Sequence, residues 1–257
     1  MSGALEVRNL TKRFHGIPAV DRVSFSIAPG EILGYVGPNG AGKSTTVKML
    51  IGLLAPSDGQ ILHNGRSVLD DLPAFQRRLG YVPEEPNLYP FLSGREYLLL
   101  VGRLRGIQRA QLDGKIENFL RLFSLAEDGD SPVSSYSKGM RQKILLSAAL
   151  LHDPEVLILD EPLSGLDVNT MIALRELLHS LAARGKIILY CSHVLDVMEK
   201  VCARLLILRK GQVVAYDTIE RLREQMGQAS LEGVFTRFTE EDARHDLAGR
   251  ILEAMRA

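Results

Sequence analysis

The sequence predicts an α/β fold in which a mostly parallel sheet carries a phosphate-binding loop. Two runs, Val156–Leu159 and Ile187–Tyr190, are apolar at every position, as is typical of central parallel strands covered by helices on both faces. A third buried strand, predicted over Glu31–Val36, leads through a glycine-rich loop into a helix predicted over Thr45–Leu54. Such loops bind their ligands at the carboxyl edge of a parallel sheet.

The amino-terminal third adds an antiparallel β layer. Val23, Phe25 and Ile27 alternate with polar serines, which is the pattern of a half-buried strand. Another predicted strand runs into the turn Asn64-Gly65, a strong signal for a hairpin. We therefore expect an antiparallel β subdomain beside the loop.

Helical periodicity replaces strand signals after Val82. Apolar residues recur there at helical spacing: Leu112, Ile116, Phe119, Leu120 and Phe123. We expect a helical insertion over about residues 83–151.

Strands then return, and the pattern of Arg204–Tyr216 predicts a hairpin. A helical appendage is expected over 219–257, with one apolar stripe through Leu231, Val234, Phe235 and Phe238 and another through Leu247, Ile251, Leu252 and Met255. These stripes either pack on the body or bind a partner.

Composition limits the class of protein. The chain has 257 residues, 46% of them hydrophobic, enough for one sizeable core with an appendage. Its 31 basic and 31 acidic residues cancel, so we expect no nucleic-acid partner. No apolar run approaches the roughly 18–20 residues of a membrane helix, and no signal peptide is expected. We expect a cytoplasmic chain that works at a membrane only through another polypeptide.

The glycine-rich loop matches the pattern Gly-x4-Gly-Lys-Ser/Thr. The residues expected to bind ATP there are Gly37, Pro38, Asn39, Gly40, Ala41, Gly42, Lys43, Ser44 and Thr45. Glycines let backbone N–H groups turn toward an anion. Lys43 can reach the β- and γ-phosphates, and the Ser44 hydroxyl can ligate Mg²⁺. A chance glycine-rich turn is the alternative, and the strand–loop–helix context argues against it.

Two carboxylates follow the apolar run that ends at Leu159. Asp160 is expected to hold Mg²⁺, and Glu161 to orient or deprotonate an attacking water. The pair gains weight because it follows a phosphate loop, since an apolar strand ending in acids is common by itself. His193 comes after the next strand and can donate to a γ-phosphate, although a lone histidine is more often structural.

With these motifs on one chain, the sequence resembles the nucleotide-binding subunits of the ABC transporter family over roughly residues 4–217. Tyr136-Ser137-Lys138-Gly139-Met140 resembles the family's signature loop, Leu-Ser-Gly-Gly-Gln. Ser164-Gly165-Leu166-Asp167 resembles the D-loop, with Asp167 as its acid, and His193 the switch histidine. Phe14 occupies the place of the aromatic residue that stacks on adenine.

The resemblance implies an ATPase domain over 1–218 that includes the helical subdomain. It implies that Ser137, Lys138, Gly139 and Met140 serve the ATP of an opposite subunit, so that two chains sandwich two ATP molecules. It also implies an integral membrane permease as partner, docked near Glu84–Arg95, where an ordinary exposed loop is the alternative. The combination of Pro-Glu-Glu at 83–85 with Ser-Lys-Gly-Met at 137–140 resembles bacterial exporters of drugs, antibiotics or sodium whose permease is a separate polypeptide.

Three departures from the family pattern stand out. Lys138 and Met140 replace Gly and Gln in the signature loop, while Ser137 and Gly139 are retained. Glu84 stands where the Q-loop glutamine is usual; a carboxylate can ligate Mg²⁺ but cannot donate a hydrogen bond. Phe14 replaces the usual tyrosine and keeps a π face, unless it is simply a core residue.

Two other functions fit parts of the pattern. A soluble ABC ATPase can act as a clamp on DNA or ribosomes, but many such proteins carry two ATPase modules or coiled-coil inserts, and this chain has one module and no heptad run. A subunit with degraded catalysis is the second alternative, which the retained Lys43, Asp160, Glu161 and His193 disfavour.

Overall fold

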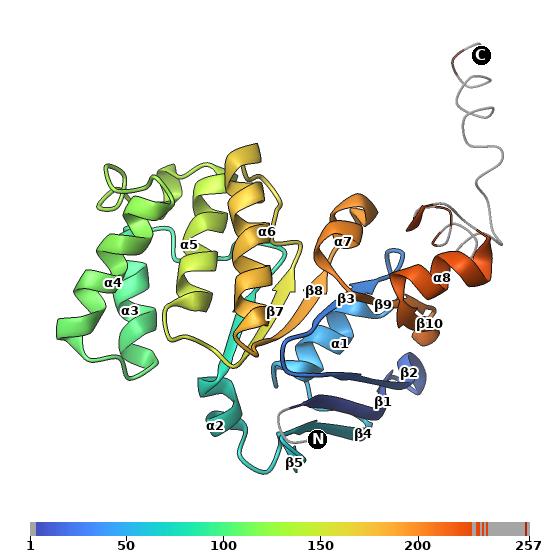
Figure 1. Cartoon of the computed structure of the whole chain (residues 1–257). Helices are drawn as coiled ribbons and strands as arrows, with labels where there is room; N and C mark the ends of the chain where they lie inside the picture. The colour runs from blue at the N-terminus through green and yellow to red at the C-terminus, as the bar shows by residue number, and fades with distance from the viewer. Residues whose placement is uncertain (1–3, 228–229, 232, 234, 236–254, 256–257) are drawn as a thin grey trace.

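The computed structural model describes residues 4–227, 230–231, 233, 235 and 255 (Figure 1). The strands are β1 Leu5–Phe14, β2 Ile17–Ile27, β3 Ile32–Val36, β4 Asp58–His63, β5 Arg66–Ser67, β6 Leu79–Val82, β7 Val156–Asp160, β8 Ile187–Cys191, β9 Arg204–Arg209 and β10 Gln212–Thr218. The helices are α1 Lys43–Leu50, α2 Leu72–Arg77, α3 Gly94–Leu104, α4 Arg109–Leu122, α5 Lys138–Leu150, α6 Val168–Ala183, α7 Leu195–Val201 and α8 Ile219–Met226.

A six-stranded sheet forms the centre, in the order β10-β9-β3-β8-β7-β6. Its neighbouring pairs are parallel, except for the antiparallel hairpin of β9 and β10. Every residue of β3, β7 and β8 is buried, because other elements cover both faces of the sheet. The predicted α/β class is therefore confirmed.

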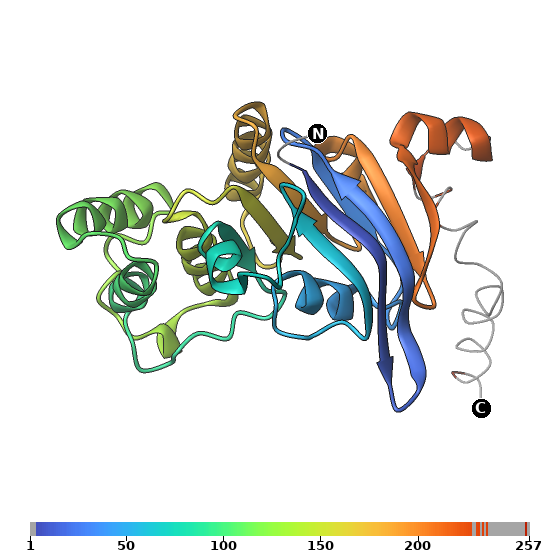
Figure 2. The same cartoon turned by 90° about the horizontal axis from the view of Figure 1, so that it is seen from below.

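The predicted antiparallel layer is also confirmed, as a second sheet in the order β2-β1-β4-β5. Val23, Phe25 and Ile27 of β2 are buried, while the serines between them are exposed. Asn64 and Gly65 both have positive φ angles, 56° and 75°, as a two-residue hairpin turn requires. Helix α1 lies between the two sheets, and its apolar side chains join both in one core (Figure 2).

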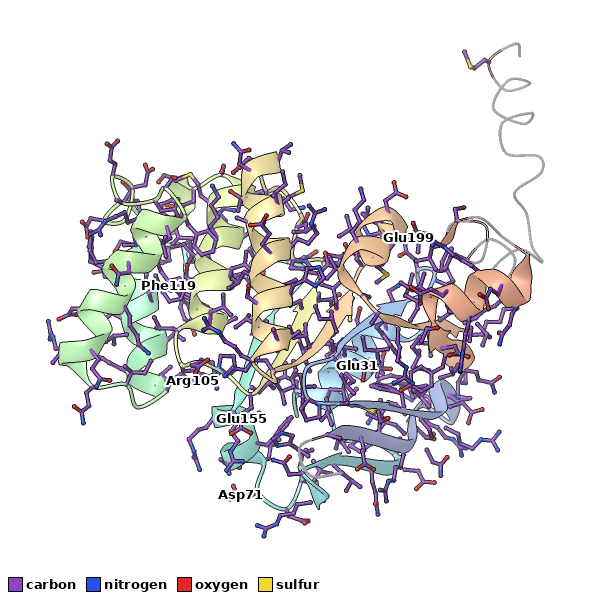
Figure 3. All side chains as sticks on the ribbon, viewed as in Figure 1. Glu31, Asp71, Arg105, Phe119, Glu155 and Glu199 are labelled. Carbon is purple, nitrogen blue, oxygen red and sulfur yellow. The ribbon has the colours of Figure 1, made fainter. Side chains whose placement is uncertain are left out.

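Helices α5, α6 and α7 cover the other face of the central sheet, where they share a second apolar core with it. Helices α3 and α4 extend with α5 to one side as an arm with its own apolar cluster (Figures 1 and 2). Arg105 lies at the base of this arm, where its guanidinium donates to the carbonyl of Gln76 on α2 (Figure 3). The helices of the predicted insertion thus lie together, and its limits at 83 and 151 stay a prediction.

The structure differs from the prediction at both ends of helix α1 and in the presence of helix α2. Helix α1 spans Lys43–Leu50 and not Thr45–Leu54, because Gly42 already serves as its N-cap and Gly52 turns the chain with a φ of 78°. Helix α2 was not predicted at all, although Asp71 caps it by accepting a hydrogen bond from the Ala74 N–H at 3.0 Å.

The carboxy-terminal region begins with the predicted helix α8. Glu199 of α7 (labelled in Figure 3) forms an ion pair with Arg223 at 2.8 Å. It also accepts a hydrogen bond from the Leu231 N–H at 2.5 Å, and Leu231 is buried. Phe235 also packs on the body, whereas Met255 is exposed. The other residues of the two predicted stripes lie outside the described residues: Val234, Phe238, Leu247, Ile251 and Leu252. Among the described helices, none combines the length and the hydropathy needed to cross a bilayer.

Candidate nucleotide site

The carboxyl ends of four parallel strands meet at one edge of the central sheet. The chain leaves β3 for the phosphate loop, β6 for Glu84, β7 for Glu161 and β8 for His193. Because parallel strands end on the same side, these segments converge although they are far apart in sequence. Together they enclose a cavity of 220 Å³. The residues that line it are Ala19, Asn39, Gly40, Ala41, Gly42, Lys43, Ser44, Thr45, Glu84, Asp160, Glu161 and His193. Ala19 is the one lining residue that no sequence motif indicated.

Backbone packing fixes the shape of the phosphate loop. Gly42 has a φ of 105°, and a β-carbon there would overlap the carbonyl oxygen of Ala19. The Thr46 hydroxyl donates to the Gly42 carbonyl at 3.0 Å and accepts from the buried Tyr35 hydroxyl at 3.0 Å, which ties α1 to β3. Any larger residue at position 42 would therefore displace the loop.

Positive groups face the cavity from the loop side. The Lys43 ammonium donates to the carbonyl oxygens of Gly37 at 2.5 Å and Pro38 at 3.2 Å, which brings these two predicted loop residues to the site. The first turn of α1 contains no acidic residue, so its positive end is not neutralised from within the helix. This side of the cavity is suited to an anion such as a polyphosphate.

Three carboxylates face the cavity from the side opposite the phosphate loop: Glu84, Asp160 and Glu161. Asp160 is buried, and burial together with the charges of Glu84 and Glu161 raises its pKa to about 6, against the opposing effect of Lys43. Mutual repulsion of this kind is relieved by a cation. The carboxylate and hydroxyl oxygens of Ser44, Glu84 and Asp160 are the ligand type that Mg²⁺ prefers.

The protein alone does not complete a metal site in the described part of the chain, where no three His, Cys, Asp or Glu side chains are grouped tightly enough to hold an ion. Mg²⁺ typically binds through one or two carboxylates together with substrate phosphates and water. The residues present therefore fit an ion that arrives with a phosphate ligand.

Glu161 is held by the segment that follows β8. Its Oε1 accepts from the His193 N–H at 2.7 Å and lies 2.6 Å from His193 Nδ1, and its Oε2 accepts from the Ser192 hydroxyl at 2.9 Å. The Glu161 backbone is left-handed, with a φ of 48°, an uncommon conformation for a residue with a side chain. The strand pattern predicted Glu161 and His193 at the ends of neighbouring strands, but no sequence pattern indicated their direct contact or the hydrogen bond from Ser192.

The predicted signature loop lies outside the cavity. Ser137 is the N-cap of α5, and its hydroxyl accepts from the Met140 N–H at 3.2 Å. The helix therefore begins at Lys138, two residues before the position near Met140 that the sequence suggested. Ser137 and Lys138 are exposed, and none of the four predicted signature residues lines the cavity beside Lys43.

The segment from Ser164 to Asp167 packs against this helix. Asp167 caps α6 by accepting from the Thr170 N–H and hydroxyl, and it pairs with Lys143 at 3.0 Å. These interactions, those with Thr170 foremost, lower the pKa of Asp167. Gly139 abuts Gly165 so closely that a β-carbon on Gly139 would overlap the Gly165 carbonyl oxygen. The predicted D-loop and signature loop are therefore neighbours in one chain.

Gly139→Ala is expected to push these two loops apart and to reduce ATPase activity by about tenfold, because small misplacements of reacting groups are costly. The control is Gly114→Ala on α4, where an added β-carbon meets nothing within 4 Å; this change should stabilise the fold by up to about 1 kcal/mol and leave turnover unchanged. Steady-state phosphate release and thermal melting test both. Equal turnover in the two variants would contradict close packing at Gly139.

Phe14 is not a core residue, so that alternative is wrong. It ends β1 with 46% of its surface exposed, and the Lys12 ammonium lies 5.5 Å from its ring centroid. An exposed ring is free to stack on a ligand. Its role toward adenine stays a prediction.

Comparisons with known proteins agree on one family. A family model described as ABC transporter matches residues 20–164. The ABC-type transporter ATP-binding protein EcsA of Bacillus subtilis (strain 168) is 35% identical over 94% of this chain and 99% of its own length. The Nod factor export ATP-binding protein I of Paraburkholderia xenovorans (strain LB400) is 40% identical over 82% of this chain and 70% of its own. A solved ATP-binding subunit of an ABC transporter superposes with a TM-score of 0.85 at 36% identity, covering 91% of this chain and 98% of that structure.

Proposed function

Because the chain belongs to the ABC transporter family, as an ATP-binding subunit with ATPase activity, we propose that it powers export through a separate membrane permease by ATP-driven closure of a dimer. The observation that carries this proposal is the division of the predicted machinery. Lys43, Asp160 and Glu161 share one cavity, while the signature loop, exposed at Ser137 and Lys138, lies apart from it. An exposed loop with phosphate-binding chemistry needs a nucleotide held by another chain.

The proposed reaction is transfer of the γ-phosphoryl group from ATP to water. Lys43 and the loop amides hold the phosphates, and Mg²⁺ bound through Ser44, Glu84 and Asp160 would offset their negative charge. Glu161 accepts the proton of the attacking water. In this proposal His193, whose Nδ1 lies 2.6 Å from Glu161 Oε1, donates to the γ-phosphate through Nε2.

In the proposed dimer, each ATP lies between the phosphate loop of one chain and the signature loop of the other. The positive end of α5 and the hydroxyl of its N-cap, Ser137, would contact the γ-phosphate of the opposite ATP. ATP binding would therefore close the dimer, and hydrolysis would reopen it. A second copy of this chain or a related ATPase subunit can supply the partner.

Export is the direction we favour because one relative is named for Nod factor export, and because Pro-Glu-Glu together with Ser-Lys-Gly-Met resembles the sequences of bacterial exporters. In this proposal the chain works at the inner face of the cell membrane, held there by its permease. Co-purification of the chain from membranes tests this. A bound integral membrane polypeptide is expected, whereas bound ribosomes or DNA would favour a soluble clamp.

The permease is proposed to dock on the loop between β6 and α3. Tyr89 and Phe91 of this loop are 61% and 93% exposed. Tyr89 approaches Tyr97 of α3, with ring centroids 6.4 Å apart, so the loop continues onto the helical arm. Aromatic rings gathered in water favour a surface that another protein covers.

Replacing both aromatics, Tyr89→Ala with Phe91→Ala, is expected to leave the basal ATPase of the isolated subunit nearly unchanged. The same variant should lose permease association or transport, because the rings face solvent and not the nucleotide cavity. Pull-down with the permease and transport in vesicles measure this. Normal assembly together with normal transport would show that coupling runs through another surface.

A further inference from the structure

Helix α5 is tied to the segment that follows Glu161 at three points. The Gln142 side chain donates from Nε2 to the carbonyl oxygen of Pro162 at 3.1 Å. Lys143 pairs with Asp167, and Gly139 abuts Gly165. The helix and the segment 161–167 must therefore move together or break these contacts.

Gln142 is the unusual member of this set. It is fully buried on α5, and its Oε1 atom is also buried, with no hydrogen-bond partner among the described protein groups. A methionine of similar length would fill the same space without burying an unpaired polar atom. Packing alone does not explain an amide here, whereas its bond to Pro162, the residue after Glu161, does.

We propose that Gln142 is a positioning residue that couples the two ATP sites of the dimer. The inference rests on the proposed function, in which Ser137 contacts the partner's ATP and Glu161 acts on the chain's own. The stretch from Ser137 to Gln142 is about 7.5 Å of continuous helix. When contact with the partner's nucleotide displaces Ser137, the displacement is thus transmitted along α5 and through the Gln142 amide to the turn that contains Glu161.

Lys143 forms a second, outer tie of the same kind. It joins α5 to Asp167, whose carboxylate also caps α6. Asp167 is exposed, so water screens this pair more than the buried Gln142 bond. Loss of Lys143 should therefore weaken the coupling less than loss of the Gln142 amide.

The test compares Gln142→Met with Gln76→Met in the full chain. Gln76 on α2 makes the same type of bond, from Nε2 to the Ile51 carbonyl oxygen at 3.1 Å, but lies outside the nucleotide cavity. For Gln142→Met we expect kcat to fall roughly tenfold, KM for ATP to change little, and the Hill coefficient for ATP to fall to about 1. Gln76→Met should keep the wild-type kcat and the wild-type Hill coefficient, which is expected to exceed 1.

A lower kcat with an unchanged Hill coefficient would overturn the coupling, because Gln142 would then only support Glu161. A wild-type Hill coefficient of 1 would overturn it as well. If Gln142→Met fails to fold, as circular dichroism would show, Lys143→Met replaces it: a lowered Hill coefficient in that variant supports the coupling, and an unchanged one overturns it. Ultracentrifugation of Glu161→Gln with ATP separates the proposed dimer function from the coupling through Gln142. If no ATP-dependent dimer forms, the composite site is rejected. If the dimer forms but the Gln142 or Lys143 variant keeps the wild-type Hill coefficient, only the coupling is rejected.

Discussion

Glu161→Gln is expected to lower ATP hydrolysis by roughly 10²–10⁴-fold while ATP binding persists. The amide keeps the size of the carboxylate but cannot accept the proton of the attacking water. Lys43 and the phosphate loop, which hold the nucleotide in our proposal, do not contact Glu161 through a hydrogen bond in the described structure. Binding and turnover should therefore separate cleanly.

The same variant is expected to accumulate an ATP-bound dimer, because closure persists when hydrolysis fails. Steady-state phosphate release, nucleotide binding and sedimentation velocity measure the three properties. Glu155→Gln is the matched control, since Glu155 precedes the same strand at its opposite end, is exposed and pairs only loosely, with Arg78 at 3.7 Å and with His63 at 3.8 Å. Wild-type turnover in Glu161→Gln would remove Glu161 from the proposed role.

Ser137→Arg is expected to abolish ATP-driven dimerisation and with it hydrolysis. Ser137 is exposed at the start of α5, so the larger cation would enter the surface that faces the partner's ATP. The phosphate loop of the same chain is untouched, and nucleotide binding by the monomer should remain near the wild-type level.

Two further variants separate this effect from damage to the helix. Ser137→Ala removes the N-cap bond to Met140 and costs about 1 kcal/mol of stability without adding bulk. Ser180→Arg adds the same side chain at an exposed position of α6, away from the predicted site. Normal ATP-dependent dimers of Ser137→Arg in the ultracentrifuge would contradict the assignment of the signature loop.

Local patterns predicted the parts of this protein whose structure depends on neighbours in sequence. The apolar runs of β7 and β8, the alternation in β2 and the Asn64-Gly65 turn each followed from spacing and composition. The phosphate loop was recognisable because glycines and Lys43 must stand at fixed offsets to surround an anion. Helix ends were less predictable, because capping by Gly42 and Ser137 competed with apolar periodicity.

Contacts between residues far apart in the sequence depend on how the helices and strands pack. Glu161 is held by Ser192 and His193, about thirty residues further along the chain, because β7 and β8 lie side by side and end together. The contact of Gln142 with Pro162 likewise depends on how α5 packs over the sheet. Such pairs leave no periodic signal, since a hydrogen bond between two buried elements is set by their packing and not by the residues adjacent to either partner. Local sequence patterns were thus enough to predict several of the strands, the phosphate loop and the candidate catalytic acids, and the packing of α5 and β8 sets what orients these acids.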